Sequence, residues 1–170
     1  MGTWREASVD EPAAHALLAE YFAARAESFP ASQGEYRTVF PVGEQFVPPR
    51  GVFLVVEGED LAGDAADVGC GGIRRLDDAA AGLGQSALPE LSYEVKHLWL
   101  QPHTRGTGLG RALLAELERR AREFGAAVVV LDTNESQEAA ASLYRSSGYV
   151  EVPPYNDNAN ATNWFAKRLV

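Results

Sequence analysis

The chain has 170 residues, 46% of them hydrophobic, which suits one compact domain with a substantial core. It carries 15 basic and 24 acidic residues, a net charge of −9. This balance argues against a general nucleic-acid surface and favours cationic molecules such as amines, although acidity also serves solubility alone. Without a membrane-length apolar run, a signal peptide or a partner for the single Cys70, we expect a cytoplasmic, membrane-free protein.

The N-terminal half predicts mainly strands, with one helix among them. Residues 4–9 alternate as a strand, and apolar residues at helical spacing then indicate a helix that Asp10 caps and Pro12 begins. We also expect a short helix near 34–38. Two apolar segments on either side of a turn are typical of a hairpin, 51–57 and 67–74.

The C-terminal half predicts alternating strands and helices. Residues 77–89 are rich in Ala and Gly without periodicity, which indicates a surface loop. One helix is expected over 108–124 and a second one before Gly148. The strands of this half are expected at 91–100, 127–131, 149–152 and 162–169. Hairpins followed by strand–helix alternation favour a mixed α/β sheet.

The most informative segment runs from Gln101 to Arg111, between a predicted strand and a predicted helix. The first turn of a helix has unpaired N–H groups at the positive end of its dipole, and glycines let an anion approach them. The segment therefore predicts a phosphate or pyrophosphate site, with a ligand-free connection as the alternative. A Walker loop is excluded because Gly110 is not followed by Lys-Ser/Thr, and the glycine spacing does not fit the dinucleotide fingerprint.

Three motifs resemble those of the GNAT N-acetyltransferase superfamily. Residues 105–110, Arg-Gly-Thr-Gly-Leu-Gly, are similar to its pyrophosphate loop, Arg/Gln-x-x-Gly-x-Gly/Ala. Residues 93–100 resemble its fourth strand, and 139–149 resemble its Ala-x-x-Leu-Tyr-x-x-x-Gly-Phe/Tyr helix. The resemblance covers about 3–170 and implies a single α/β GNAT domain, like that of uncharacterised bacterial small-molecule acetyltransferases. It implies a mixed, mostly antiparallel sheet of about seven strands, splayed between the fourth and fifth, with about four helices.

The resemblance implies acetyl-CoA as the acyl donor and no metal. In the family, the pantetheine arm pairs with the backbone of the fourth strand, and the pyrophosphate lies on the glycine loop. Many members have an asparagine seven residues before the motif tyrosine, where this chain has Gln137, with Asn134 three residues earlier. Gln137 and Asn134 are each expected to contact the carrier or, alternatively, to cap the next helix, for which Ser136 is a rival cap. The expected carrier-binding residues are Leu98, Trp99, Leu100, Arg105, Gly106, Thr107, Gly108, Leu109, Gly110, Arg111, Asn134 and Gln137.

Two catalytic residues follow from the same resemblance. Tyr144 takes the place of the family's tyrosine, whose hydroxyl protonates the departing thiolate, and a phenol is protonated at neutral pH. Glu94 takes the place of a glutamate that deprotonates the amine, directly or through water; an ion pair with Lys96 is the alternative. Strand alternation places Glu94, Lys96 and Leu98 on one face and His97 on the other. His97, His103 and His15 are weaker candidates for the base.

The acceptor is expected at the more variable parts of the chain. Tyr155, Asn156 and Asp157 combine an aromatic ring and a carboxylate that suit a cationic amine, or form a ligand-free polar turn. The expected function is acetyl transfer to the primary amine of a small molecule rather than of a protein. A homodimer is a possible assembly of the enzyme. A longer acyl-CoA, a non-catalytic CoA-binding sensor and, least of all, a nucleotide hydrolase are the alternatives.

Overall fold

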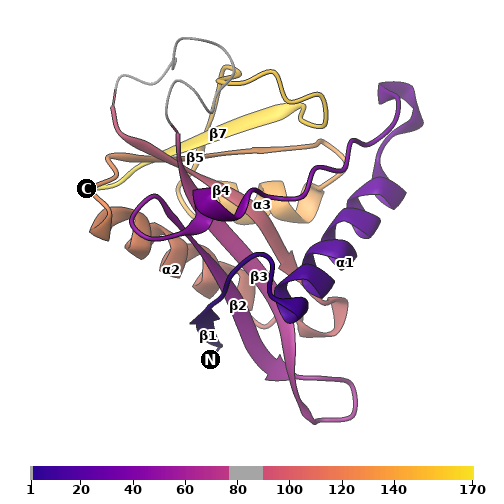
Figure 1. Cartoon of the computed structure of the whole chain (residues 1–170). Coiled ribbons are helices and arrows are strands. Elements are labelled where there is room, and N and C mark those ends of the chain that lie inside the picture. The colour runs from indigo at the N-terminus through magenta and orange to yellow at the C-terminus, as the bar shows by residue number, and fades with distance from the viewer. Residues whose placement is uncertain (1, 77–89) are drawn as a thin grey trace.

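The computed structural model describes residues 2–76 and 90–170, so the expected loop at 77–89 lies outside the described residues. Within them, one seven-stranded sheet has the order β1-β2-β3-β4-β5-β7-β6 and carries three α-helices (Figure 1). The strands are β1 (Thr3–Glu6), β2 (Gly51–Glu59), β3 (Ala65–Leu76), β4 (Ser92–Leu100), β5 (Val128–Thr133), β6 (Val150–Val152) and β7 (Asn163–Arg168). The helices are α1 (Pro12–Ser28), α2 (Leu109–Glu123) and α3 (Glu138–Ser146), with short 3-10 helices η1 (Ala31–Gln33), η2 (Gly43–Phe46) and η3 (Pro102–Thr104).

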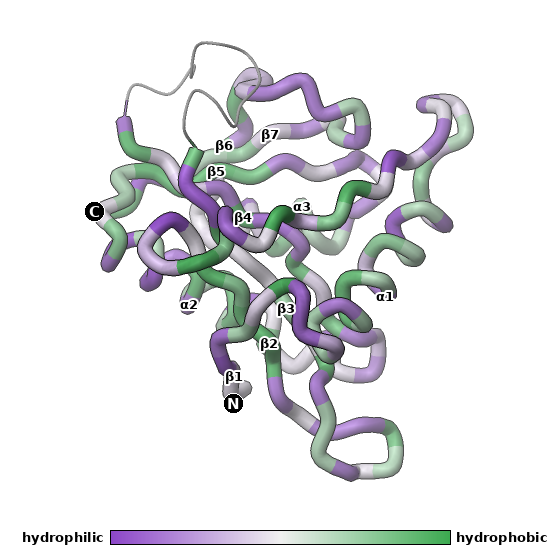
Figure 2. The backbone as a smooth tube through the Cα atoms, in the orientation of Figure 1, coloured by the Kyte–Doolittle hydropathy of each residue, from purple (hydrophilic) through white to green (hydrophobic). Residues whose placement is uncertain are grey.

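Helices cover both faces of the sheet (Figure 1). On one face, α1 buries Leu18 and Phe22 against Phe53 of β2. On the other face, α2 buries Leu113 and Leu117 in the larger core, which Tyr144 of α3 also joins. The core residues that the strands contribute beneath these helices include Val52, Leu54, Ile73, Val95, Val129, Leu131 and Phe165. The apolar runs of β2 and β5 are green in Figure 2, as expected for strands buried on both faces. No helix in the described ranges is long and apolar enough to cross a membrane.

The sheet opens between β4 and β5, its only parallel pair of neighbours in the described part. Pairing covers Ser92 to Glu94 on β4 and Val128 to Val130 on β5. Beyond Glu94, β4 continues to Leu100 without β5 as a neighbour, while β5 stays paired with β7 to its end. This confirms the mixed, splayed α/β sheet that the motifs imply, with three α-helices instead of about four.

A β-bulge interrupts β4 just beyond the opening. His97 and Leu98 lie opposite the single residue Gly71 of β3, and His97 has a left-handed φ of 57°. The extra residue keeps His97 on the α1 face, where its ring lies 5.5 Å from that of Phe22, and turns Leu98 into the core under α2. The expectations that Leu98 shares a face with Glu94 and that His97 faces away from it are therefore wrong, because alternation fails at a bulge.

Local signals placed some element ends wrongly. The first strand ends at Glu6, and α1 begins after Glu11 without a side-chain cap, so Asp10 does not cap it. The short helix expected at 34–38 does not form; the 3-10 helices η1 and η2 lie before and after this segment. The side chain of Asn134 does not cap α3 either; its Oδ1 accepts a hydrogen bond from the backbone N–H of Ser136 at 2.9 Å, in a turn that precedes the helix.

Candidate active site

The glycine loop has the backbone shape that an anion site needs. Gly106 and Gly108 have φ values of +77° and +85°, and a Cβ on either would meet no atom within 4 Å. Conformation rather than crowding therefore demands glycine at both positions. Gly108 is the N-cap of α2, and the first intrahelical bond runs from the N–H of Ala112 to the Gly108 carbonyl at 3.0 Å. The N–H groups of the intervening turn are left for a ligand.

The two arginines of the loop are held differently. The guanidinium of Arg105 lies 4.9 Å from the ring centroid of Trp99, and its Nε donates to the Leu100 carbonyl at 3.0 Å, which leaves its Nη groups for a phosphate. Arg111 donates to Ser146 Oγ at 2.7 Å and to Ser147 Oγ at 3.1 Å. It thus ties the start of α2 to the end of α3, and its charge stays beside the loop.

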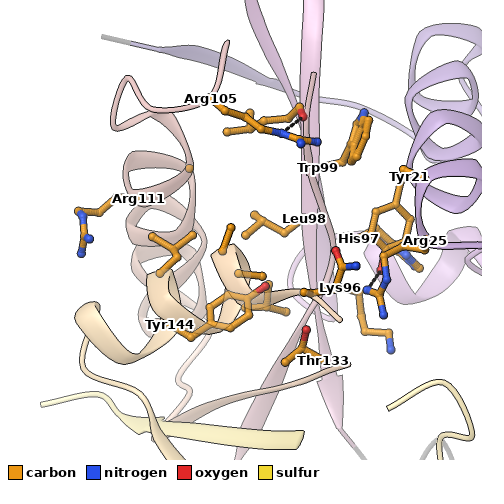
Figure 3. A pocket seen from close by; sticks show the side chains of 18 of the residues that line it. Tyr21, Arg25, Lys96, His97, Leu98, Trp99, Arg105, Arg111, Thr133 and Tyr144 are labelled. Atoms are coloured by element: carbon orange, nitrogen blue, oxygen red, sulfur yellow. Dashed lines mark hydrogen bonds between the residues drawn. The ribbon is translucent and has the colours of Figure 1, made fainter. Parts of the chain in front are cut away.

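A pocket of about 390 Å³ runs from this loop along the free edge of β4 to α3 (Figure 3). Residues Val95 to Leu100 of β4 form one wall, and Gln137 and Tyr144 contribute from the α3 side. Tyr144 is 7% exposed, and no described residue hydrogen-bonds its hydroxyl. Burial, assisted by nearby Tyr21, raises the pKa of Tyr144, so its hydroxyl stays protonated at neutral pH.

A second pocket, of about 520 Å³, lies on the α1 side of the opening. Its wall includes Glu94, the segment after α1 and the loop before β7. Five residues line both pockets and mark where they join: Tyr21, Arg25, Lys96, His97 and Asp132. The opened sheet therefore gives access to one point from two sides, which suits a reaction between two different substrates.

Glu94 lies at the floor of the second pocket in a saturated network. Its side chain is 1% exposed. Oε1 accepts from Arg74 Nε at 3.0 Å and pairs with Arg74 Nη2 at 2.9 Å, while Oε2 accepts from the Tyr155 hydroxyl at 2.6 Å. Lys96 Nζ lies 4.0 Å from Oε1, so the ion pair considered from the sequence is present at its outer limit. Both carboxylate oxygens are thus engaged before any substrate arrives.

The loop expected to hold the acceptor is partly consumed in this network. Tyr155 is buried, and Asn156 donates to Asp132 at 2.8 Å and accepts from the Trp164 indole at 2.8 Å. Asp157 is exposed at the rim. All three line the second pocket, but the polar groups of Tyr155 and Asn156 face protein partners.

Sequence reasoning missed Asp132 and misplaced His97. Asp132 follows the continuous apolar run of β5, a signal that was available. Burial raises its pKa, but the charge of Lys96 and hydrogen bonds from Asn156 and Asn158 outweigh burial, so its pKa is lowered and it stays ionised. Burial and the charges of nearby cations, Lys96 foremost, lower the pKa of His97 to about 3, and its Nδ1 has no partner among the described residues.

The remaining expected residues lie farther from the junction. Asn134 is fully buried, and its Nδ2 donates to Gln33 Oε1 at 2.8 Å and to the Asn160 carbonyl at 3.0 Å, which fastens two loops. Gln137 lines the first pocket and donates to Ser28 Oγ at 2.9 Å. His103 and His15 are exposed. Among the residues described, no cluster of His, Cys, Asp or Glu could hold a metal ion.

Comparisons with known proteins agree with this geometry. Residues 14–149 match the family model of the acetyltransferase (GNAT) family. The IAA acetyltransferase of Azospirillum brasilense is 35% identical over 88 residues, 52% of this chain and 50% of that protein. The N-alpha-acetyltransferase RimI of Mycobacterium tuberculosis is 38% identical over 85 residues, 50% and 46% of the two chains. The chain thus spans about half the length of these curated relatives.

Solved structures show the same fold over nearly the whole chain. A Klebsiella pneumoniae protein assigned to the acyl-CoA N-acyltransferases has a TM-score of 0.69 at 26% identity and covers 100% of this chain and 99% of its own. A GNAT family acetyltransferase from Elizabethkingia anophelis with acetyl-CoA bound has a TM-score of 0.59 at 15% identity, covering 99% and 98%. By its family match, its motifs and its opened sheet, the chain belongs to the GNAT acetyltransferase family.

Proposed function

We propose that the protein transfers an acetyl group from acetyl-CoA to the primary amine of a small molecule. The observation that carries this proposal is the meeting of two pockets at the opening between β4 and β5. The first pocket has a free strand edge and a positive-φ glycine loop, which fit a pantetheine arm and a pyrophosphate. The second is lined by charged and aromatic side chains, which fit a polar amine.

Acetyl-CoA supplies the acetyl group as a thioester, so its thiol is the leaving group. We propose that Tyr144 donates its hydroxyl proton to the departing sulfur, since this hydroxyl opens on the first pocket and remains protonated. We propose Glu94 as the base that takes the proton of the amine. Because Arg74 and Tyr155 already engage its oxygens, Glu94 would act through an intervening solvent molecule. Asp132, ionised at the junction, attracts the ammonium form of the acceptor.

The test is amine-dependent release of free thiol from acetyl-CoA, with a panel of amino acids, polyamines, aminoglycosides and short peptides. We expect release with a small amine and none without an acceptor. Profiling acetyl-CoA against longer acyl-CoA esters checks the acyl group. Acetyl-CoA binding without release by any amine would instead favour the non-catalytic CoA-binding sensor. Activity confined to peptides would contradict the small-molecule assignment.

A further inference from the structure

Arg25 is a cation at the junction of the two pockets that makes no direct ion pair with any described residue. It lies in the last turn of α1, is half-buried and lines both pockets (Figure 3). Within residues 2–76 and 90–170 it forms no ion pair, whereas Arg74 pairs with Glu94 and Lys96 lies 3.9 Å from Asp132. A guanidinium that makes no direct ion pair keeps N–H donors available for an anionic ligand.

Aromatic side chains hold this guanidinium in place. Its Nη1 donates to the Tyr21 hydroxyl at 3.3 Å, and its Cζ lies 5.8 Å from the Tyr21 ring centroid and 5.7 Å from that of Tyr36. Contacts with ring faces orient a guanidinium but leave most of its N–H donors free. If Arg25 served only to compensate the negative end of the α1 dipole, its guanidinium would not need to be held by two aromatic rings. Arg25 is therefore presented to the pocket with its edge available.

The rest of the pocket favours an acceptor that carries both charges. The chain has a net charge of −9, yet the second pocket has four cationic and three anionic residues on its wall (Arg25, Arg37, Arg74 and Lys96; Glu94, Asp132 and Asp157). Asp132 faces the same junction as Arg25 and is held by amides of Asn156 and Asn158, without an ion pair to Arg25. The two opposite charges are close enough for Arg25 to lower the pKa of Asp132.

We propose that Arg25 binds a carboxylate of the acceptor, with the ammonium group directed to Asp132. A planar guanidinium matches a carboxylate through two parallel hydrogen bonds, which gives both strength and orientation. Arg25, Asp132 and Tyr144 all line the first pocket, so an acceptor whose carboxylate and reacting nitrogen lie close together fits this junction. The acceptor class is a small amine with a nearby carboxylate, such as a free amino acid. This inference rests on the proposed acetyl transfer.

The test compares amino acids with their carboxamides, which keep the amine and remove the carboxylate charge. For the wild-type protein we expect kcat/KM to be higher for the acids by about 10- to 100-fold, as for a hydrogen bond to a charged group. Arg25→Gln should lower kcat/KM for the acids by a similar factor and leave the amides and the KM for acetyl-CoA unchanged. Arg25→Lys should restore part of the loss. Arg122→Gln is the matched control, because Arg122 is exposed on α2 and lines neither pocket.

Each other result would overturn the inference. Equal turnover of acids and amides by the wild-type protein would refute it without any variant, while leaving acetyl transfer intact. An equal loss for both acceptor types in Arg25→Gln, or a raised KM for acetyl-CoA, would assign Arg25 to folding or to the carrier. A preference for phosphate-bearing amines such as phosphoethanolamine would show that Arg25 binds a phosphate and not a carboxylate, which contradicts the inference. No thiol release with any amine would refute the proposed acetyl transfer and the carboxylate site together.

Discussion

The hydrogen bond between Tyr155 and Glu94 offers a sharp test of the network under the second pocket. Tyr155→Phe removes the donor 2.6 Å from a carboxylate whose side chain is 1% exposed. Among the described residues, only the Asn156 amide, at 3.5 Å, then still hydrogen-bonds that oxygen. A hydrogen bond to a charged group contributes about 1.5–3 kcal/mol, so we expect the free energy of unfolding to fall by that amount. For a chain of this size, the melting temperature should fall by about 3–12 °C.

Tyr149→Phe is the matched control for this prediction. Tyr149 is also buried, at 3% exposure, but its hydroxyl has no hydrogen-bond partner among the described residues. Removing an unsatisfied buried hydroxyl should leave the stability unchanged or raise it. Thermal unfolding of both variants, followed by circular dichroism at pH 7.5, measures the difference. If Tyr155→Phe lowers the melting temperature no more than Tyr149→Phe does, the network does not stabilise the fold and the reasoning fails.

Three further predictions concern catalysis and acidity. Tyr144→Phe should lower kcat by roughly 10- to 10⁴-fold with little change in acetyl-CoA affinity by calorimetry, and near-normal turnover would contradict the acid role. Glu94→Gln should lower kcat by roughly 10²- to 10⁴-fold with little change in the KM for acetyl-CoA, since it removes the base, and a near-normal kcat excludes Glu94. The pKa of His97 is about 3 in the folded state, against an ordinary value of 6.5. Between pH 6.5 and pH 3 only the unfolded state takes up this proton, so the free energy of unfolding decreases as the pH is lowered. The expected decrease from pH 7.5 to pH 5 is about 2 kcal/mol. Denaturant unfolding at pH 7.5 and pH 5 should show a smaller loss of stability for His97→Gln than for the wild-type protein. An equal loss for both proteins would contradict the assignment to His97.

The part of the site made by one continuous segment was predictable from the sequence. Residues 105–110 specify their own backbone, because only glycine readily adopts the left-handed conformation at Gly106 and Gly108. The helix that follows is amphipathic, and its start fixes where the free N–H groups lie. Short-range rules therefore suffice to predict the conformation of the glycine loop, where we propose that the pyrophosphate binds, at one end of the first pocket.

The second pocket was not predictable in the same way, because its contacts join residues distant in the chain. Arg74 and Tyr155 meet at Glu94 from positions 20 and 61 residues away. Either residue alone indicates nothing about a buried carboxylate. The sequence also marks Tyr155 and Asn156 as a polar turn, yet the fold directs their polar groups inward to Glu94 and Asp132. Pairwise partners of this kind require the topology.

The bulge in β4 explains why the junction has its particular chemistry. With regular alternation, His97 would have pointed to the α2 face, and only Lys96 of the two would have faced the second pocket. The left-handed residue costs on the order of 1–2 kcal/mol, and it places both Lys96 and His97 at the meeting point of the pockets. The loss of β5 pairing beyond Glu94 exposes the strand edge at the same level. In the proposed reaction, the opening and the bulge act together: the opening admits the carrier, and the bulge sets the charge and shape that the acceptor meets.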